Sequence, residues 1–355
     1  MKQILKAAVL VGAVCGLCVQ TPALAAQAKK AETTTAKKSS KSAAKASPKS
    51  ASKAVPGKTA AGKTSKVAVH NAANAPVKKV AATAKPASKP VRAALDMDGD
   101  PRRLALYSAS ALVVDQSTGQ PLVEKQPDAV VPIASISKLM TAMVVLDAKL
   151  DMQEVIAVGD EDVDTLKGSR SRLPVGTTMT RETAMLLALM SSENRAAHAM
   201  GRHYPGGMPA FVQAMNKKAH ALGMYNSRFE EPTGLSSNNV STAHDLARMV
   251  AAAARYPEIR QASTTAEAKV ELNGRIRDFH NTNALVRSDN WEIGVSKTGY
   301  ISEAGRCLVM QARVADKPVV IVLLDSVGKM TRVGDAQRIK RWMESASLAS
   351  DRRKT

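Results

Sequence analysis

Three short groups of residues carry side chains suited to nucleophilic catalysis. In chain order they are Ser135 with Lys138, Ser192 with Asn194, and Lys297-Thr298-Gly299. At the start of a helix, positions i and i+3 share a face, so Ser135 Oγ and Lys138 Nζ come within hydrogen-bond reach. The pair therefore predicts a serine nucleophile whose proton is taken by a lysine.

The neighbouring groups complete this chemistry. A lysine accepts a proton near neutral pH only if burial or a nearby cation lowers its pKa, and Lys297 is the expected cation for Lys138. Ser192 and Asn194 are expected at the tip between two helices. There Ser192 would relay a proton to the leaving group, and Asn194 would hold a substrate amide.

The third group, Lys297-Thr298-Gly299, is expected to end an apolar strand. Lys297 and Thr298 can bind a substrate carboxylate there, and Gly299 lets a ligand lie against the strand edge. The attacked carbonyl develops an oxyanion, which two backbone N–H groups stabilise. The candidates for these donors are the N–H groups of Ser135 and Tyr300.

This prediction rests on the chain order of the three motifs and on the element in which each is expected, because each motif alone is common. Ser-x-x-Lys recurs at Ser42/Lys45 and Ser50/Lys53 in low-complexity sequence. Residues 57–64 even fit the phosphate-binding loop pattern, but no hydrophobic strand precedes them and no packed helix follows, so we reject nucleotide binding. Three motifs in one order, each in the expected helix, loop or strand, are a much rarer coincidence.

Hydrophobic periodicity predicts the elements that position these motifs. Strands are expected at Ser108–Asp115, Pro121–Lys125, Lys269–Leu272, Trp291–Ser296, Leu308–Val314 and Val319–Leu324. Helices are expected at Ser137–Leu146, Thr180–Met190, Glu193–His203, Pro209–Leu222, Thr242–Tyr256 and Gln337–Ser347, and residues 155–178 indicate a strand, a loop and a strand. Strands near both ends with helices between them predict an α/β (α+β) fold. One antiparallel sheet would combine both ends of the chain, and a helical lobe would face it across a cleft.

The first hundred residues have a different character. Lys2 and Lys6 precede an apolar run that ends at Ala23-Leu24-Ala25, which predicts a signal peptide over residues 1–25, cleavage near Ala25 and a periplasmic protein. Residues 26–103 are rich in Ala, Lys, Ser, Thr and Pro and are expected to be disordered. The globular domain is then expected at residues 104–347, followed by a short tail at 348–355.

The formal net charge of +20 belongs mainly to this tail. Residues 29–92 hold 16 basic residues and one acidic residue, and the signal peptide adds two lysines, so the rest of the chain carries only +3. The tail is expected either to bind an anionic membrane or cell-wall surface or to act as a plain linker. Because the chain is exported, no nucleic acid is expected as a partner.

Cysteine and histidine positions argue against a metal or redox cofactor. Cys15 and Cys18 leave with the signal peptide, and Cys307 is expected to be a small apolar residue of a buried strand. None of the six histidines forms the i, i+4 pair with an intervening glutamate that zinc peptidases use, and His198 and His203 are expected on a helix surface. We expect no cofactor and no metal.

With its motifs placed, the chain from Leu104 to Ser347 resembles the low-molecular-mass penicillin-binding proteins of the D-alanyl-D-alanine peptidase family. Residues 132–143, 189–197 and 231–236 are most similar to its endopeptidase branch. The resemblance implies a β-lactamase/DD-peptidase-like fold. It also implies a serine D,D-endopeptidase that hydrolyses D-Ala–meso-diaminopimelate cross-links of peptidoglycan through an acyl-enzyme on Ser135, and β-lactams would acylate the same serine.

Three alternatives stay open. A D-alanyl-D-alanine carboxypeptidase shares the motifs, but such relatives commonly carry a further β-rich domain and a membrane helix, which are not expected after residue 347. A class A β-lactamase would need a glutamate in a Glu-x-x-Leu-Asn setting. Glu231 precedes Pro-Thr-Gly-Leu-Ser, so Glu230 and Glu231 are interpreted as structural. A non-catalytic wall-binding scaffold is disfavoured because no motif position is altered.

Overall fold

The computed structural model describes residues 104–351 of the 355-residue chain. The predicted signal peptide, the basic tail and the phosphate-loop pattern lie outside the described residues. The helices are η1 (Ala134–Ser137), α1 (Lys138–Asp147), η2 (Asp160–Asp162), α2 (Arg181–Met190), α3 (Asn194–Arg202), α4 (Gly207–Ala221), α5 (Ala243–Ala253), α6 (Pro257–Thr264), η3 (Ala284–Arg287) and α7 (Thr331–Asp351). The strands are β1 (Ser110–Asp115), β2 (Pro121–Lys125), β3 (Val131–Pro132), β4 (Val155–Ala157), β5 (Thr178–Thr180), β6 (Val240–Ser241), β7 (Glu267–Leu272), β8 (Arg275–His280), β9 (Glu292–Ile301), β10 (Gly305–Val314) and β11 (Lys317–Ser326).

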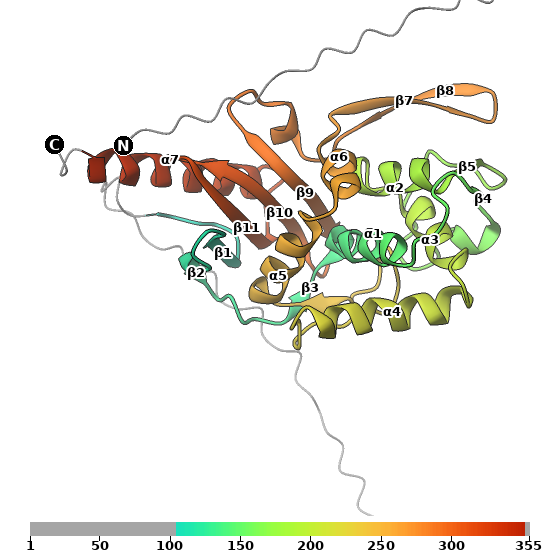
Figure 1. Cartoon of the computed structure of the whole chain (residues 1–355), viewed down its shortest axis with the longest axis horizontal. Helices are drawn as coiled ribbons and strands as arrows, with labels where there is room; N and C mark the ends of the chain where they lie inside the picture. The colour runs from blue at the N-terminus through green and yellow to red at the C-terminus, as the bar shows by residue number, and fades with distance from the viewer. Residues whose placement is uncertain (1–103, 352–355) are drawn as a thin grey trace, which may run out of the picture. The chain divides into compact units, whose positions relative to one another are not determined.

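A five-stranded antiparallel sheet in the order β2-β1-β11-β10-β9 forms the centre of the domain (Figure 1). Strand β1 pairs directly with β11, so the sheet combines the two ends of the domain as predicted. Successive side chains of β1 point to opposite faces: Ala111 and Val113 pack with α7, whereas Leu112 packs with the helical lobe. The sheet is therefore buried on both faces.

Helix α7 covers one face through Ala336, Ile339 and Met343. Its Asp335 is fully buried and accepts hydrogen bonds from the backbone N–H groups of Tyr107 and Ser108. Because a buried carboxylate without partners would be costly, these bonds fix the segment before β1 against α7. Helix α7 is also longer than predicted: it begins at Thr331 rather than Gln337 and continues to Asp351, beyond the predicted end at Ser347.

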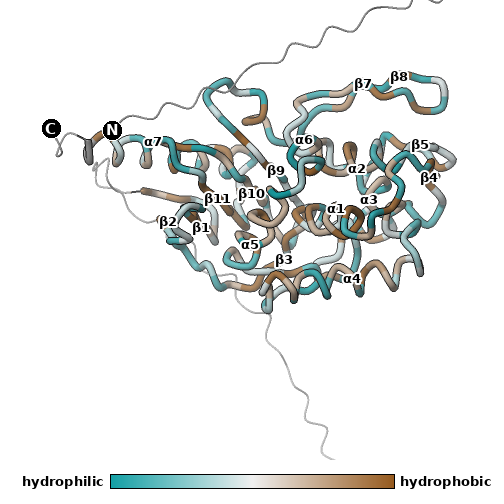
Figure 2. The backbone as a smooth tube through the Cα atoms, in the orientation of Figure 1, coloured by the Kyte–Doolittle hydropathy of each residue, from teal (hydrophilic) through white to brown (hydrophobic). Residues whose placement is uncertain are grey.

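The helical lobe packs around α1, whose residues from Lys138 to Val145 are all buried. A helix that is apolar on every side belongs in a core, and Figure 2 shows α1 largely in the hydrophobic colour. Helices α2, α3, α4, α5 and α6 contact α1. Within residues 104–351, no helix is long and apolar enough to cross a membrane.

Helix α6 and strand β8 are among the elements that the sequence-based boundaries missed. Helix α6 begins at Pro257, where the sequence predicted only the end of the preceding helix. The N–H groups of a helix's first turn have no acceptor within the helix, so a proline, which lacks this N–H, fits there without loss of a hydrogen bond. Strand β8 pairs with β7 in a hairpin around Asn273-Gly274, both of which have positive φ. An Asn-Gly pair is a strong signal for such a turn.

Strand β9 is the third correction, and it affects the site. The prediction ended the strand at Ser296 and put Lys297-Thr298-Gly299 at its end, whereas β9 continues to Ile301. Residues 297–301 lack an apolar alternation, but pairing with β10 from Val309↔Lys297 to Gly305↔Ile301 holds them extended. Because β9 is the last strand of the sheet, its outer edge has no strand partner among residues 104–351.

Candidate active site

The first motif lies where η1 passes into α1. Ser135 is in η1, Lys138 is the first residue of α1, and Lys138 Nζ lies 2.9 Å from Ser135 Oγ, as the spacing predicted. The turn is tightly held. Ala134 has a φ of +50°, and Gly234 packs so closely that a Cβ on it would stand 1.9 Å from the Ala134 carbonyl oxygen. The position at 234 therefore requires glycine.

The ammonium group of Lys138 has three acceptors. Besides Ser135 Oγ, they are Asn194 Oδ1 at 2.7 Å and the Thr233 carbonyl oxygen at 2.6 Å. Lys138 is only 1% exposed. Three acceptors match the three N–H donors of a protonated lysine, so the position of Nζ is fixed. When Lys138 is neutral, its lone pair can therefore face the Ser135 hydroxyl.

Burial sets the acid–base behaviour of Lys138. Desolvation lowers its pKa from 10.5 to about 7, and the negative charges of Glu231, Glu193 and Asp164 oppose that fall. The sequence pointed to Lys297 as the cation responsible, whereas burial is the main cause. Lys297 is buried as well, and its pKa is lowered well below its ordinary value by burial, by repulsion from Lys138 and by Arg332.

The second and third motifs meet directly. Lys297 Nζ donates to Ser192 Oγ at 2.9 Å and to the Thr298 carbonyl oxygen at 3.0 Å. Ser192 has a φ of +62°, a backbone conformation that is unusual for serine and costs free energy. Thr298 Oγ1 donates to Thr282 Oγ1 at 2.7 Å. The structure thus brings the predicted residues of all three motifs to one place.

A loop outside the motifs orients Asn194. The Asn194 side chain donates through Nδ2 to Ser169 Oγ at 2.9 Å, which leaves Oδ1 facing Lys138. Asp164 accepts the Ser169 backbone N–H, and Glu193 accepts from the Ser171 hydroxyl. Asp164 thus holds the loop of residues 163–172 internally, and Ser169 and Ser171 anchor it beside Asn194.

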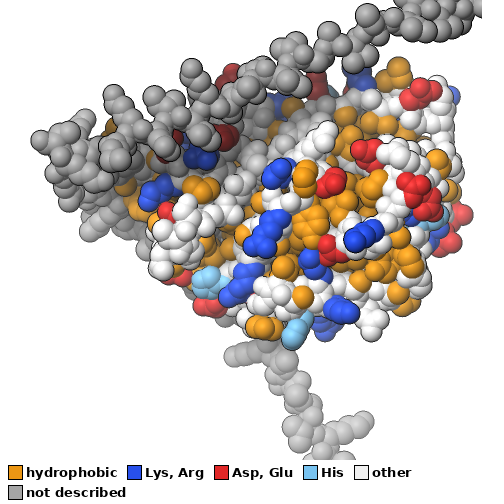
Figure 3. All heavy atoms as spheres, in the orientation of Figure 1, with side chains coloured by type: hydrophobic (Ala, Val, Ile, Leu, Met, Phe, Trp, Pro, Cys, Tyr) orange, Lys and Arg blue, Asp and Glu red, His pale blue; other side chains and the backbone are white. Residues whose placement is uncertain are grey.

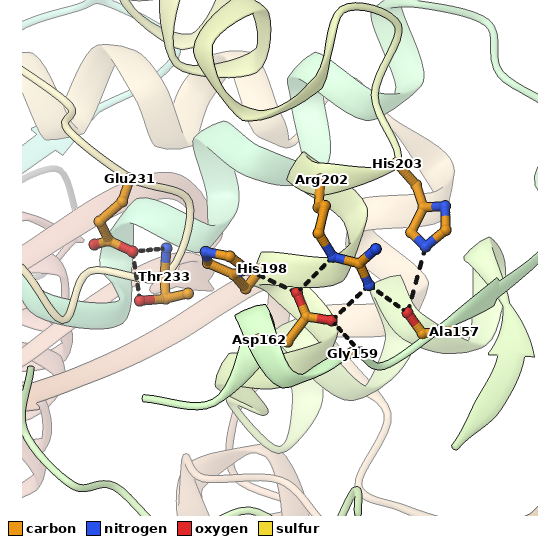
Figure 4. Close-up of polar contacts among 8 residues, drawn as sticks. All are labelled: Ala157, Gly159, Asp162, His198, Arg202, His203, Glu231 and Thr233. Atoms are coloured by element: carbon orange, nitrogen blue, oxygen red, sulfur yellow. Dashed lines mark hydrogen bonds and ion pairs between the residues drawn. The ribbon is translucent and has the colours of Figure 1, made fainter. Parts of the chain in front are cut away.

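Helix α3, which begins at Asn194, is anchored by Asp162 of η2. His198 Nδ1 lies 2.7 Å from Asp162 Oδ1, and Arg202 Nη2 donates to Asp162 Oδ2 at 2.8 Å (Figure 4). Burial alone would raise the pKa of Asp162, but hydrogen bonds from His198, Arg202 and the Gly159 N–H outweigh it and hold the pKa at about 2. These contacts fix the angle at which α3 presents Asn194.

Glu231 has the structural role predicted for it. Its carboxylate accepts from the backbone N–H of Thr233, at 2.6 Å, and from the Thr233 hydroxyl (Figure 4). It also accepts from the backbone N–H of Gly234, at 2.6 Å. The carboxylate thereby closes the turn that directs the Thr233 carbonyl at Lys138. Its charge also favours the protonated form of Lys138.

Strand β9 packs against the turn that carries Ser135. A Cβ on Gly299 would lie 3.1 Å from Ser135 N, so the strand and the serine backbone are close. Gly299 pairs with Cys307, and Arg332 Nη1 reaches both of their carbonyl oxygens, at 2.9 and 3.2 Å. Both carbonyls therefore lie between β9 and β10. Because alternate residues of a strand point their polar groups to opposite sides, the N–H of Tyr300 points to the free edge.

Sequence reasoning missed Arg332, Ser169 and the Thr233 carbonyl. Arg332 lies at the start of α7 and Ser169 lies in a loop, and neither belongs to a motif of its own. Only the similarity of residues 231–236 to known peptidases pointed to Thr233. Cys307 is fully buried in β10, and burial raises its pKa to about 11, in agreement with an apolar structural role. Among residues 104–351, no three His, Cys, Asp or Glu side chains gather as metal ligands would.

Comparison with known proteins identifies the family of the chain. The family model described as D-alanyl-D-alanine carboxypeptidase matches residues 98–328. The chain belongs to this family. Family membership, the peptidase class and the fold class predicted from the motifs are thereby confirmed.

Two relatives within the D-alanyl-D-alanine carboxypeptidase family are especially similar. The chain is 49% identical over 271 residues to a D-alanyl-D-alanine endopeptidase of Pseudomonas aeruginosa, a match that covers 76% of this chain and 86% of the relative. It is 48% identical over 245 residues to a D-alanyl-D-alanine endopeptidase of Escherichia coli, covering 68% and 79%.

Solved structures agree with the fold. The crystal structure of the Streptomyces K15 DD-transpeptidase matches with a TM-score of 0.63 at 26% identity, over 68% of this chain and 98% of that chain. A D-alanyl-D-alanine carboxypeptidase structure from Mycobacterium tuberculosis matches with a TM-score of 0.61 at 26% identity, over 67% and 90%.

Proposed function

We propose that the protein is a periplasmic serine D,D-endopeptidase that hydrolyses D-Ala–meso-diaminopimelate cross-links of peptidoglycan. The observation that carries the proposal is a buried lysine with a pKa of about 7 whose Nζ lies 2.9 Å from Ser135 Oγ. Such a lysine is a base at neutral pH, and a serine beside it is an activated nucleophile.

In the acylation step, Ser135 Oγ attacks the D-Ala carbonyl carbon while its proton passes to Lys138 Nζ. The backbone N–H groups of Ser135 and Tyr300 hold the oxyanion that forms. Collapse of this intermediate breaks the amide C–N bond. The proton leaves Lys138 and reaches the departing amine of diaminopimelate through Ser192, whose hydroxyl is held by Lys297.

Substrate binding uses the same groups. The leaving diaminopimelate carries a carboxylate next to the cleaved amide, and Lys297 and Thr298 bind it. The approach of that negative charge favours the protonated form of Lys297, whose pKa is depressed in the free enzyme. Asn194 has one N–H left after Ser169 is satisfied, and this N–H holds the donor-stem carbonyl.

In the deacylation step, water is the nucleophile and Ser135 is the leaving group. A water attacks the Ser135 ester, Lys138 takes the water's proton, and the proton returns to Ser135 Oγ as the ester bond breaks. A β-lactam also forms an ester with Ser135, so it inhibits the enzyme for as long as the attack of water on that ester is slow.

The preference for cross-links is supported by the two endopeptidase relatives at 49% and 48% identity. A carboxypeptidase would use the same groups to release terminal D-alanine. The decisive experiment incubates the mature protein with cross-linked dimeric muropeptides and with monomeric pentapeptides. Conversion of dimers to monomers without free D-alanine supports the proposal, and D-alanine release from pentapeptides alone refutes it.

A matched pair of variants tests the nucleophile in the same assay. Ser135→Ala should abolish turnover and labelling by a fluorescent penicillin. Ser42→Ala removes the serine of a Ser-x-x-Lys pattern with the same spacing in the tail and should change neither. Labelling that persists in Ser135→Ala would place the nucleophile elsewhere.

Location and surface contacts complete the proposal. The signal peptide over residues 1–25 would direct the chain to the periplasm, and a mature N-terminus at Ala26 would establish cleavage after Ala25. The basic residues 29–92 would bind an anionic membrane or wall surface. The face of the folded domain in Figure 3 carries Lys and Arg interspersed with Asp and Glu, so the domain itself is not strongly basic there.

A further inference from the structure

An exposed ion pair connects the two segments that flank the site. Lys167 Nζ lies 2.5 Å from Glu303 Oε1, and the two side chains are 28% and 42% exposed. Lys167 belongs to the loop of residues 163–172, two positions before Ser169, which contacts Asn194. Glu303 lies in the turn that joins β9 to β10, three positions after Tyr300.

The proposed chemistry fixes which end of the substrate passes this pair. Lys297 and Thr298 hold the leaving group, and the Tyr300 N–H holds the carbonyl. The acylated donor stem must then continue along the free edge of β9 past Ile301, as an added strand would. Three residues of extended chain span about 10 Å, which is within reach of the long side chain that precedes D-alanine.

That side chain has a distinctive end in diaminopimelate stems, because one carbon bears both an ammonium and a carboxylate. We propose that Lys167 and Glu303 form the subsite for this zwitterionic end of the donor stem. The carboxylate pairs with Lys167 and the ammonium with Glu303, so one ion pair is exchanged for two. This inference rests on the proposed function.

The pair is suited to such an exchange. Surface ion pairs contribute little to stability, so the Lys167–Glu303 contact can be opened at small cost. Both partners are nevertheless held in place: Ser302 Oγ donates to Glu303 Oε2 at 2.8 Å, and Asp164 accepts the Lys167 backbone N–H at 3.0 Å. The hydrogen bond from Lys167 also holds the pKa of Glu303 at about 2, so Glu303 is charged at working pH.

The test compares two dimeric muropeptides that differ only at the donor side-chain end, one with its carboxylate and one with a carboxamide. Rates are expressed as kcat/KM per penicillin-titratable site. The wild-type protein should prefer the carboxylate dimer about tenfold, as for a charge-assisted contact. Lys167→Ala should bring that ratio to about one, and Lys167→Arg should preserve most of it.

Arg313→Ala is the matched control. Arg313 pairs with Glu292 at 3.5 Å in a more exposed ion pair at the opposite end of β9 and β10, and its loss should leave the ratio at the wild-type value. A wild-type ratio near one, or a ratio that Lys167→Ala does not change, overturns the subsite. If only pentapeptides are cleaved, the same two side-chain ends are compared on pentapeptides. The endopeptidase proposal then fails while the subsite is still tested.

Discussion

The pKa of Lys138 gives the most quantitative prediction. Lys138 must be neutral to accept the Ser135 proton, so the acylation rate should rise with pH and reach half its plateau at about pH 7. At pH 7 about half of such lysines are neutral, compared with about one in 3000 for a lysine of pKa 10.5. Burial therefore increases the population of the reactive form about a thousandfold.

A carboxylate variant moves this midpoint in a known direction. Asp164 is one of three negative charges that favour the protonated form of Lys138, so Asp164→Asn should lower the pKa and shift the acid limb to lower pH. The shift should be the smallest that removal of one of the three charges produces, because Asp164 has the weakest of the three effects on Lys138.

The assay is the second-order rate of labelling by a fluorescent penicillin from pH 5 to pH 9. Asp316→Asn is the control, because Asp316 lies in the β10–β11 turn with a φ of +61° that asparagine also tolerates, and its profile should match the wild type. An acid limb near pH 10 would refute the buried-base reasoning. A shift of the Asp164→Asn limb to higher pH would refute the assigned electrostatics.

Three further predictions follow from separate features. Gly234→Ala should abolish penicillin labelling, because its Cβ would overlap the Ala134 carbonyl; near-normal labelling of the folded variant would show that the turn relaxes without harm to Ser135. Asp162→Asn should lower the free energy of unfolding in urea by about 1–3 kcal/mol, because His198 and Arg202 lose a buried charged partner; an unchanged midpoint would contradict the anchoring role. Deletion of residues 29–92 should leave muropeptide turnover intact but weaken binding to sacculi or anionic vesicles in a salt-dependent manner, and unchanged binding would make the tail a linker.

The parts of the site that follow from local geometry could be predicted from the sequence. Ser135 and Lys138 meet because three residues of helical backbone bring them together, and the resulting distance is 2.9 Å. That one sheet combines both ends of the domain also followed from the order of strands and helices, and the structure realises it by pairing β1 with β11. The first conclusion needs only the periodicity of the helix, and the second needs only the order of the elements.

Contacts between distant segments could not be predicted in the same way. The Thr233 carbonyl, Ser169 and Arg332 reach the site through packing that no local pattern encodes. The same limit applies to the main cause of the low Lys138 pKa: the sequence contains Lys297, but only the packed structure shows that Lys138 is 1% exposed. The length of β9 likewise depends on its pairing with β10.

In the proposed mechanism the donor stem acylates Ser135 as the acceptor stem departs. The acyl-enzyme can be trapped by rapid quenching of the reaction with a cross-linked dimer, followed by mass spectrometry of the peptide that contains Ser135. We expect a donor-stem adduct on Ser135 and an equal burst of released acceptor stem. Dimer cleavage with no adduct on that peptide, or an adduct accompanied only by free D-alanine, would contradict it.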